Sequence, residues 1–321
     1  MTFFEALVAL AYAVFADAPA DVAIVEVGMG GTWDATSVAH ADVAVVTPID
    51  LDHMHFLGST VEAIASEKAG IITEGSSAIL AAQPDSVAEI LIERCEEVGA
   101  TRYAVGERLG LDAREVALGG QLLTIRGIAG EYDEIFLPLH GQHQADNAVL
   151  ALAAVEAFFG GERRLDPDVV RAGFAAVTSP GRLEVVRRSP TILVDAAHNP
   201  HGMAALREAL DESFSFATLV GVVAIFADKD AHEMLEALEP ALAHVVVTRN
   251  SSPRSMAVDR LAEIARGIFG VDRVSMATHL PDAIDLAASL AEADGMGGGV
   301  IATGSVVTAA DVRHLLGVTQ G

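Results

Sequence analysis

Short apolar segments alternate with amphipathic segments along most of this chain, and this alternation restricts its fold more than any other feature. Apolar runs are typical of buried strands and amphipathic runs of helices, so the order predicts an α/β protein with a largely parallel sheet. Strands are expected at Val22–Val27, Val43–Thr47, Ser77–Leu80, Ile192–Asp195, Leu219–Ile225, His244–Thr248, Val274–Ala277 and Gly299–Ala302. Helices are expected at Pro84–Val98, Gln144–Phe159, Gly202–Glu212, Asp230–Leu242 and Ala257–Ile268.

Two segments interrupt the alternation. Tyr103–Leu139 contains short alternating runs separated by glycines, which predicts a small antiparallel insertion. Ser179–Glu184 is rich in turn-forming residues and precedes a new strand, so we place a domain boundary near residue 186. With 321 residues, 51% of them hydrophobic, the chain can bury the cores of two domains, 1–186 and 187–321.

Charge and cysteine content limit the classes of partner and the compartment. A net charge of −25 argues against nucleic acid or an anionic membrane as a partner. The single Cys95 leaves no internal disulfide and fits a reducing cytoplasm. The apolar N-terminal segment 2–18 lacks a basic region, carries Glu5 and is too short to span a membrane, so we expect a buried helix there.

Lys68 is one of two lysines, the other being Lys229. Ser59 and Glu62 form a capping-box pattern that predicts a short helix ending near Gly70. On that helix Lys68 shares one stripe with three apolar residues, Val61, Ile64 and Ala65. A buried ammonium group must lose its proton, find a partner or be chemically modified. The alternative is a lysine whose stem lies on apolar surface while its amine reaches water.

Polar residues collect directly after the predicted strands. In open α/β sheets ligands bind beyond the carboxyl ends of the strands, so this placement predicts a binding site. Glu26 lies just inside a strand end and precedes a glycine-rich turn, where it is either a metal ligand or a hydrogen-bonded edge residue. Further polar groups follow other strands, at Asp50–His53, Asp195–Pro200, Asp228–Asp230 and Thr303–Ser305. Gly141–Asn147 opens a helix, whose first turn offers free N–H donors.

Six motifs in order resemble the folylpolyglutamate synthase/dihydrofolate synthase family of the Mur ligase superfamily. They are Val25–Thr36, Thr47–His53, Ser66–Ile72, Gly141–Ala148, Pro180–Glu184 and Asp195–Pro200. The resemblance implies a P-loop-type Mur ligase central domain, truncated before Thr2 and carrying the small insertion. A Rossmann-like C-terminal α/β domain, the glutamate ligase domain, would follow it.

The same resemblance implies an ATP-dependent ligase. ATP would phosphorylate a pterin-linked carboxylate of dihydropteroate or a folate, and L-glutamate would attack the acyl phosphate. Two Mg²⁺ ions would assist, with Glu26 and His53 as ligands and Lys68 carbamylated to supply another. The nucleotide and phosphates would meet five residues: Gln144, Asn147, Arg182, Asp195 and His198. Lys68, Arg182 and His198 would be catalytic, with a hinge near Pro180.

One family motif is missing. The sequence contains no G-x-x-x-x-G-K-[ST] motif, which the resemblance places ahead of Thr2. We expect a mis-assigned start site, although a split gene or a true loss of the segment would also account for the missing motif. The alternatives to a folate ligase are a non-catalytic remnant that acts as a binding module and a Mur-type ligase for another acceptor. The resemblance also suggests a monomer.

Overall fold

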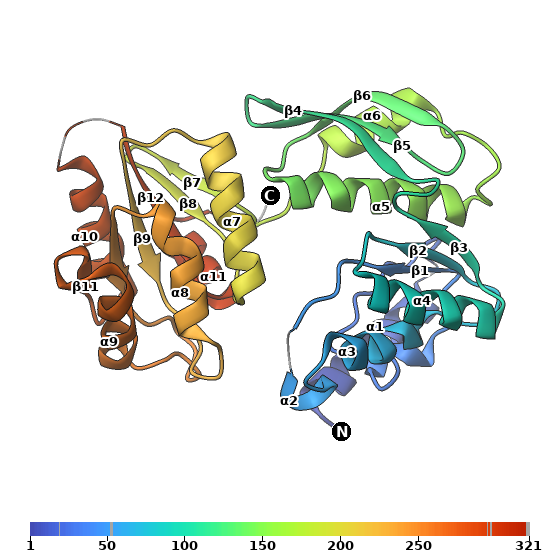
Figure 1. Cartoon of the computed structure of the whole chain (residues 1–321), viewed down its shortest axis with the longest axis horizontal. Coiled ribbons are helices and arrows are strands. Elements are labelled where there is room, and N and C mark those ends of the chain that lie inside the picture. The colour runs from blue at the N-terminus through green and yellow to red at the C-terminus, as the bar shows by residue number, and fades with distance from the viewer. Residues whose placement is uncertain (19, 52–53, 294, 296, 319–321) are drawn as a thin grey trace. The chain divides into compact units, whose positions relative to one another are not determined.

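The computed structural model describes residues 1–18, 20–51, 54–293, 295 and 297–318, and within them the chain forms two compact units. The first unit comprises Met1–Ala113, Thr124–Asp133 and Asp146–Val170. The second comprises Arg114–Leu123, Glu134–Ala145 and Arg171–Gly321, and Figure 1 labels the elements of each unit. None of the helices among the described residues is long and apolar enough to cross a membrane.

The first unit contains a parallel sheet of strand order β1-β2-β3. Its strands are β1 (Val43–Val46), β2 (Ser77–Leu80) and β3 (Thr101–Ala104). Its helical segments are α1 (Phe3–Asp17), η1 (Ala35–Val38), α2 (Met54–Leu57), α3 (Val61–Lys68), η2 (Ala69–Ile71) and α4 (Asp85–Val98). Helix α4 connects the parallel strands β2 and β3, and it buries Val87, Leu91 and Cys95 on the stripe that faces the core.

A separate three-stranded sheet of order β4-β5-β6 follows, where the small insertion is predicted. Its strands are β4 (Gly110–Ala117), β5 (Gly120–Arg126) and β6 (Glu131–Leu137). The connections between them are too short for parallel crossovers, so the strands run antiparallel. Helices α5 (Gln142–Phe158) and α6 (Pro167–Ala175) come next.

The second unit is built on a six-stranded sheet of order β11-β10-β9-β12-β8-β7. Its strands are β7 (Glu184–Arg188), β8 (Thr191–Val194), β9 (Thr218–Val223), β10 (His244–Val247), β11 (Val274–Met276) and β12 (Gly298–Thr303). All its pairings are parallel except that between β7 and β8. Its helical segments are α7 (Pro200–Ser213), α8 (Ala231–Leu238), η3 (Glu239–Ala241), α9 (Val258–Phe269), η4 (Val271–Arg273), α10 (Leu280–Glu292) and α11 (Val306–Leu315).

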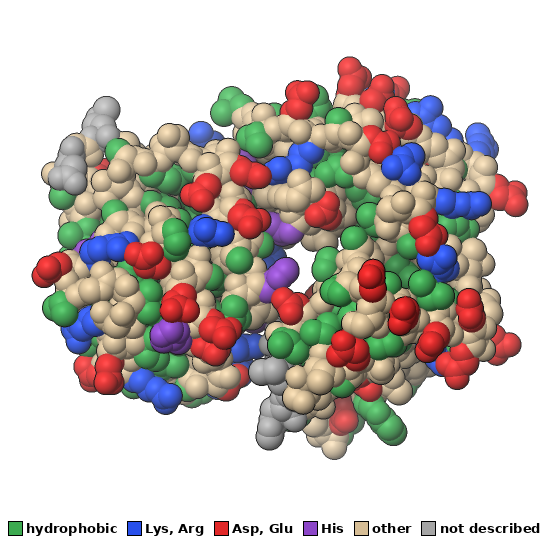
Figure 2. Space-filling model, in the orientation of Figure 1, with side chains coloured by type: hydrophobic (Ala, Val, Ile, Leu, Met, Phe, Trp, Pro, Cys, Tyr) green, Lys and Arg blue, Asp and Glu red, His purple; other side chains and the backbone are tan. Residues whose placement is uncertain are grey.

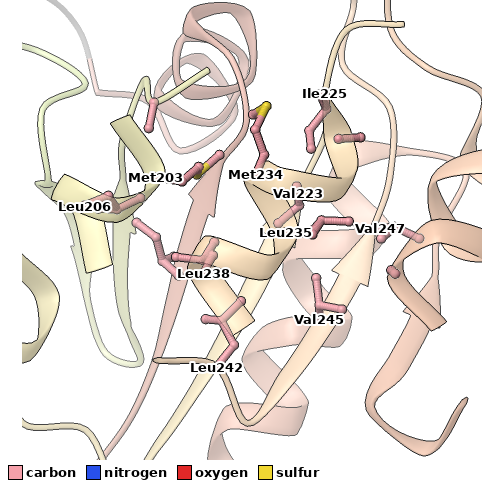
Figure 3. Packing of buried hydrophobic residues seen from close by; sticks show 14 of the residues in the cluster. Met203, Leu206, Val223, Ile225, Met234, Leu235, Leu238, Leu242, Val245 and Val247 are labelled. Atoms are coloured by element: carbon pink, nitrogen blue, oxygen red, sulfur yellow. The ribbon is translucent and has the colours of Figure 1, made fainter. Parts of the chain in front are cut away.

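Both faces of this six-stranded sheet are buried. On one face Val223, Val245 and Val247 pack against side chains of α7 and α8 such as Leu206 and Leu235 (Figure 3). On the other face a second cluster joins alternate strand residues to α10 and α11. Strands covered by helices on both sides read as continuous apolar runs, which is why the sequence predicts them well. The α/β fold expected from the sequence is confirmed.

Three local predictions are wrong. Val22–Val27 forms no strand, because β1 stays at the edge of its sheet without pairing to this segment and Ile24 is 94% exposed. Helix α1 forms as predicted, yet none of its residues is buried. The side chain that caps α3 belongs to Thr60, which accepts from the Ala63 backbone N at 3.2 Å, and not to Ser59.

Candidate functional site

A glycine-rich loop, residues 28–33, packs against the C-terminal end of α3. The backbone N and the Oγ1 of Thr32 both donate to the carbonyl oxygen of Glu67, at 3.1 and 3.2 Å. A Cβ at Gly31 would lie only 2.6 Å from that same carbonyl oxygen. A Cβ at Gly70 would lie 2.7 Å from the backbone N of Thr32. Glycine at both positions therefore allows the two backbone segments to approach this closely.

Replacing Gly70 by alanine is expected to lower the free energy of unfolding of the first unit by about 1–3 kcal/mol, the usual cost of overpacking. The new methyl group would push the loop away from α3 and weaken the bonds between Thr32 and Glu67. Urea unfolding followed by fluorescence checks this, since Trp33, the single tryptophan, lies on the loop. Gly173→Ala is the control: it lies in α6 within the second unit, with open space around it, and should leave the unfolding of the first unit unchanged. Equal stability of Gly70→Ala and the wild type would contradict the packing argument.

Lys68 is the last residue of α3 and is half-buried. Ile64 and Ala65 on the same stripe are fully buried, as the predicted stripe requires. The backbone of Lys68 lies against the glycine-rich loop, because a Cβ at Gly31 would lie 3.1 Å from its Cα. Lys68 thus stands where α3, the loop and η2 meet.

The other two predicted metal ligands are not brought to Lys68 by any described contact. Glu26 is exposed in the irregular segment that replaces the expected strand. His53 lies outside the described residues. Among the described residues, no three His, Cys, Asp or Glu side chains gather closely enough to hold a metal ion.

A cavity of about 860 Å³ adjoins the glycine-rich loop within the first unit. Phe4 and Tyr12 of α1, Trp33 of the loop and Phe56 give it a mainly apolar wall, and Glu67 adds a carboxylate. A volume of this size suits a small organic molecule. Acidic side chains are spread over the visible face of the molecule, in line with the net charge of −25 (Figure 2).

In the second unit, a strained turn is held against the end of β8. Asp195 is 8% exposed and accepts from the backbone N of Leu183 at 2.9 Å and of Ala197 at 2.8 Å. Leu183 has a φ of 44°, which non-glycine residues rarely adopt, so its bond to Asp195 stabilises a costly conformation. The carbonyl oxygen of Gly181 also accepts from the backbone N of Ala196 at 2.8 Å. These bonds hold the backbone on both sides of Arg182, whose side chain is exposed and whose charge acts on Asp195.

Burial raises the pKa of the Asp195 carboxyl, while its two backbone hydrogen bonds and the charges of Arg182 and His198 act in the opposite direction. His198 is half-buried, and its Nδ1 lies 3.0 Å from the carbonyl oxygen of Ala196. Asn199 caps α7 by accepting from the backbone N of Gly202 at 2.7 Å. Arg182, Asp195 and His198 therefore form one group at the carboxyl end of β8 and the start of α7.

Gln144 and Asn147, the remaining predicted nucleotide contacts, lie in the first turns of α5. Gln144 is half-buried and its backbone N donates to the carbonyl oxygen of Gly141 at 3.1 Å. Asn147 is exposed. Both predicted positions at the start of this helix thus have an accessible side chain.

Comparison with known proteins identifies the family. The model of the Mur ligase middle domain matches residues 2–155, and that of the Mur ligase glutamate ligase domain matches residues 181–306. A dihydrofolate synthase/folylpolyglutamate synthase of Mycobacterium tuberculosis is 51% identical over 335 residues, which cover 99% of this chain and 69% of the relative. The chain belongs to the dihydrofolate synthase/folylpolyglutamate synthase family of Mur ligases. The family assigned from the six motifs is confirmed, and with it the class of ATP-dependent ligases.

Solved structures of this family share the fold. The folylpolyglutamate synthase of M. tuberculosis complexed with ADP and AMPPCP has a TM-score of 0.96 and covers 100% of this chain and 74% of the other. Escherichia coli FolC in complex with DHPP and ADP has a TM-score of 0.86 at 29% identity, over 99% of this chain and 72% of the other. The second family member in particular holds both a nucleotide and another ligand.

One buried polar residue at the carboxyl edge of the second sheet was not predicted from the sequence. Asn250 follows β10, is 6% exposed, and donates from Nδ2 to Ser305 Oγ at 3.0 Å and to Thr308 Oγ1 at 3.1 Å. Thr308 Oγ1 in turn donates to the carbonyl oxygen of Ala224 at 3.0 Å. These bonds join the segments that follow β9, β10 and β12. The polar run after the apolar strand at residues 244–247 is the signal that could have revealed Asn250.

Proposed function

We propose that this chain works as an ATP-dependent ligase that adds L-glutamate to dihydropteroate, to folates or to both. The observation that carries the proposal is its 51% identity, with a TM-score of 0.96, to the M. tuberculosis protein. The names of the relatives supply the substrates, and their complexes with ADP and AMPPCP support ATP as the energy source. A monomer with domains 1–186 and 187–321 belongs to the same proposal.

The reaction has two steps. A carboxylate oxygen of the acceptor attacks the γ-phosphorus of ATP, the bond from that phosphorus to the bridging oxygen breaks, and ADP leaves with an acyl phosphate formed. The amino group of L-glutamate then attacks the acyl carbon, inorganic phosphate leaves, and the nitrogen releases a proton. Both steps concentrate negative charge on phosphate oxygens, so fixed positive groups and N–H donors are the main catalytic requirement.

The residues of the second unit have the chemistry for this task. Arg182 offers an exposed guanidinium with a fork of donors that suits phosphate oxygens. Asp195 holds the turn that presents Arg182, and His198 lies beside it at the start of α7. We propose that Gln144 and Asn147 contact the nucleotide from the first turns of α5.

Mg²⁺ remains a prediction of the family resemblance. Its proposed ligands are Glu26, His53 and Lys68, the last as a carbamate. Because the described carboxylates and imidazoles form no three-ligand cluster, the described donors do not make a metal site by themselves.

Isotope transfer from the acceptor tests the proposal. Dihydropteroate labelled with heavy oxygen in its carboxylate, incubated with the protein, MgATP and L-glutamate, is expected to pass label into the released phosphate. Omitting L-glutamate should stop amide formation. Turnover of a muramyl peptide, with none of dihydropteroate or a folate, would show that the acceptor is a different molecule. Amide formation with unlabelled phosphate would contradict an acyl phosphate intermediate. ATP binding with no ligation of any acceptor would favour a binding module.

A further inference from the structure

A chain of polar side chains in the second unit joins the start of α5 to the end of α7. Gln121 is 1% exposed, and its Nε2 donates to the carbonyl oxygen of Gly141 at 3.1 Å. Its Oε1 accepts from Arg114 Nε at 2.6 Å. Arg114 also donates two hydrogen bonds to Glu212, from Nη1 to Oε1 at 3.3 Å and from Nη2 to Oε2 at 2.5 Å. The three side chains thus form a continuous connection that no step of the proposed reaction uses.

The first end of this connection supports the turn that carries Gln144. The carbonyl oxygen of Gly141 accepts from Gln121 Nε2 and also from the backbone N of Gln144, both at 3.1 Å. Because Gly141 has a φ of 93°, the turn requires a conformation that only glycine adopts easily. A buried amide that bonds the same oxygen restricts the movement of this turn, and with it the direction of the Gln144 side chain.

The second end of the connection lies on α7. Glu212 belongs to the last turn of this 14-residue helix, while His198 and Asn199 stand immediately before its first turn. Such a helix is about 20 Å long and behaves as a rigid rod. Its hydrogen bonds with Arg114 lower the pKa of the Glu212 carboxyl, so the charged form is the one that this contact favours. The charge on Glu212 therefore holds the far end of the helix that follows His198.

Direct packing reinforces the connection. The ring of His140 lies 5.1 Å from that of Phe214, the residue directly after α7. A Cβ at Gly141 would lie 2.9 Å from the Cβ of Ala209 on the same helix. The start of α5 and the end of α7 thus touch through apolar atoms as well as through Gln121, Arg114 and Glu212.

We propose that Gln121, Arg114 and Glu212 are positioning residues that hold the Gln144 turn and helix α7 in one rigid frame for nucleotide binding. The functional half of this proposal rests on the proposed ligase function, whereas the structural half does not. None of the three touches the reacting atoms in this scheme, and they act through Gln144 and through the helix that begins after His198.

Local hydrogen exchange tests the structural half. Gln121→Glu keeps an acceptor for Arg114 but removes the donor to Gly141, so exchange at the Gln144 amide should rise about tenfold, the effect of losing one net hydrogen bond. Arg114→Gln should increase exchange both there and in the last turn of α7. Arg102→Gln, which removes an unrelated ion pair with Glu107 at 2.6 Å, is the control and should leave both segments unchanged. A uniform rise throughout the second unit, or no rise at Gln144, would overturn the frame.

Steady-state kinetics test the functional half. In Gln121→Glu the KM for ATP should rise about fivefold while kcat stays within about twofold of the wild-type value. The reason is that a misplaced Gln144 weakens ATP binding equally in the ground state and the transition state, which raises KM and leaves kcat unchanged. A fall in kcat with unchanged KM would overturn the positioning role. If the wild type ligates no acceptor, the proposed function fails, and the exchange experiment still decides whether the frame exists.

Discussion

Arg182→Ala is expected to lower kcat of the ligase about 100- to 1000-fold, the usual effect of removing one donor that stabilises transition-state charge. The side chain is exposed, while the turn beneath it is held by backbone bonds to Asp195 and Gly181 that the substitution leaves in place. Stability should therefore change by less than about 0.5 kcal/mol, as for most surface substitutions. The measurements are initial rates with ATP and L-glutamate and the free energy of unfolding.

Two comparisons make this result specific to the guanidinium group. Arg188→Ala removes another exposed arginine, on β7, and should keep wild-type kcat. Free guanidinium ion at low concentration should restore part of the activity of Arg182→Ala, because the truncated side chain leaves space for it. Unchanged kcat in Arg182→Ala would contradict the proposal that this residue stabilises charge on the phosphate oxygens. A large loss of stability would assign the kinetic defect to folding.

The strands of the second unit were predictable because their environment leaves a strong pattern. Parallel strands covered on both faces are apolar along their whole length, so β8, β9, β10 and β12 stand out from the polar residues around them. Polar residues directly after such strands predict where ligands bind, and Asp195 and His198 follow β8 in this way. Arg182 was expected only from the family resemblance, and its charge acts on Asp195 in the structure. The roles of these three residues in the reaction stay predictions.

Features that depend on distant partners were not predictable from local pattern. Val22–Val27 reads as a strand because it is apolar, but a strand also needs a neighbouring backbone to pair with, and local sequence does not reveal one. Ser59 and Thr60 are both good caps, and only the backbone geometry selects Thr60. The bond between Arg114 and Glu212 joins residues 98 positions apart, with no signal in the sequence.

Asp195→Asn is expected to reduce ligase activity about 100-fold and to destabilise the second unit at acidic pH. The wild-type carboxyl group accepts from two backbone N–H groups, of Leu183 and Ala197, with separate oxygens. When it is protonated in acid, its hydroxyl oxygen keeps a lone pair, so both oxygens can still accept. Asparagine offers one oxygen and one NH₂ group, so one buried N–H would face another donor, at a cost of about 1–3 kcal/mol. The turn at Leu183, whose φ is 44°, would then relax and move Arg182.

The pH dependence of this effect has a definite sign. Burial raises the native pKa of Asp195 above its unfolded value of about 3.9. A group with a raised native pKa contributes stability that is fully present below the unfolded pKa and is lost as the pH rises through the native pKa. The stability advantage of wild type over Asp195→Asn should therefore be largest in acid and shrink toward neutral pH.

Asp228→Asn provides the opposite control. Partial burial pushes the pKa of Asp228 up, but the hydrogen bonds and charge of Arg254 outweigh it and lower the pKa. The contribution of Asp228 is thus present above its unfolded pKa and is lost as the pH falls. Urea unfolding of wild type and both variants from about pH 3 to about pH 7, which spans the titration of a carboxyl group, should show gaps of opposite slope. A gap for Asp195→Asn that widens toward neutral pH would mean that Asp195 is held as a stabilised carboxylate, and the account of its burial would be wrong.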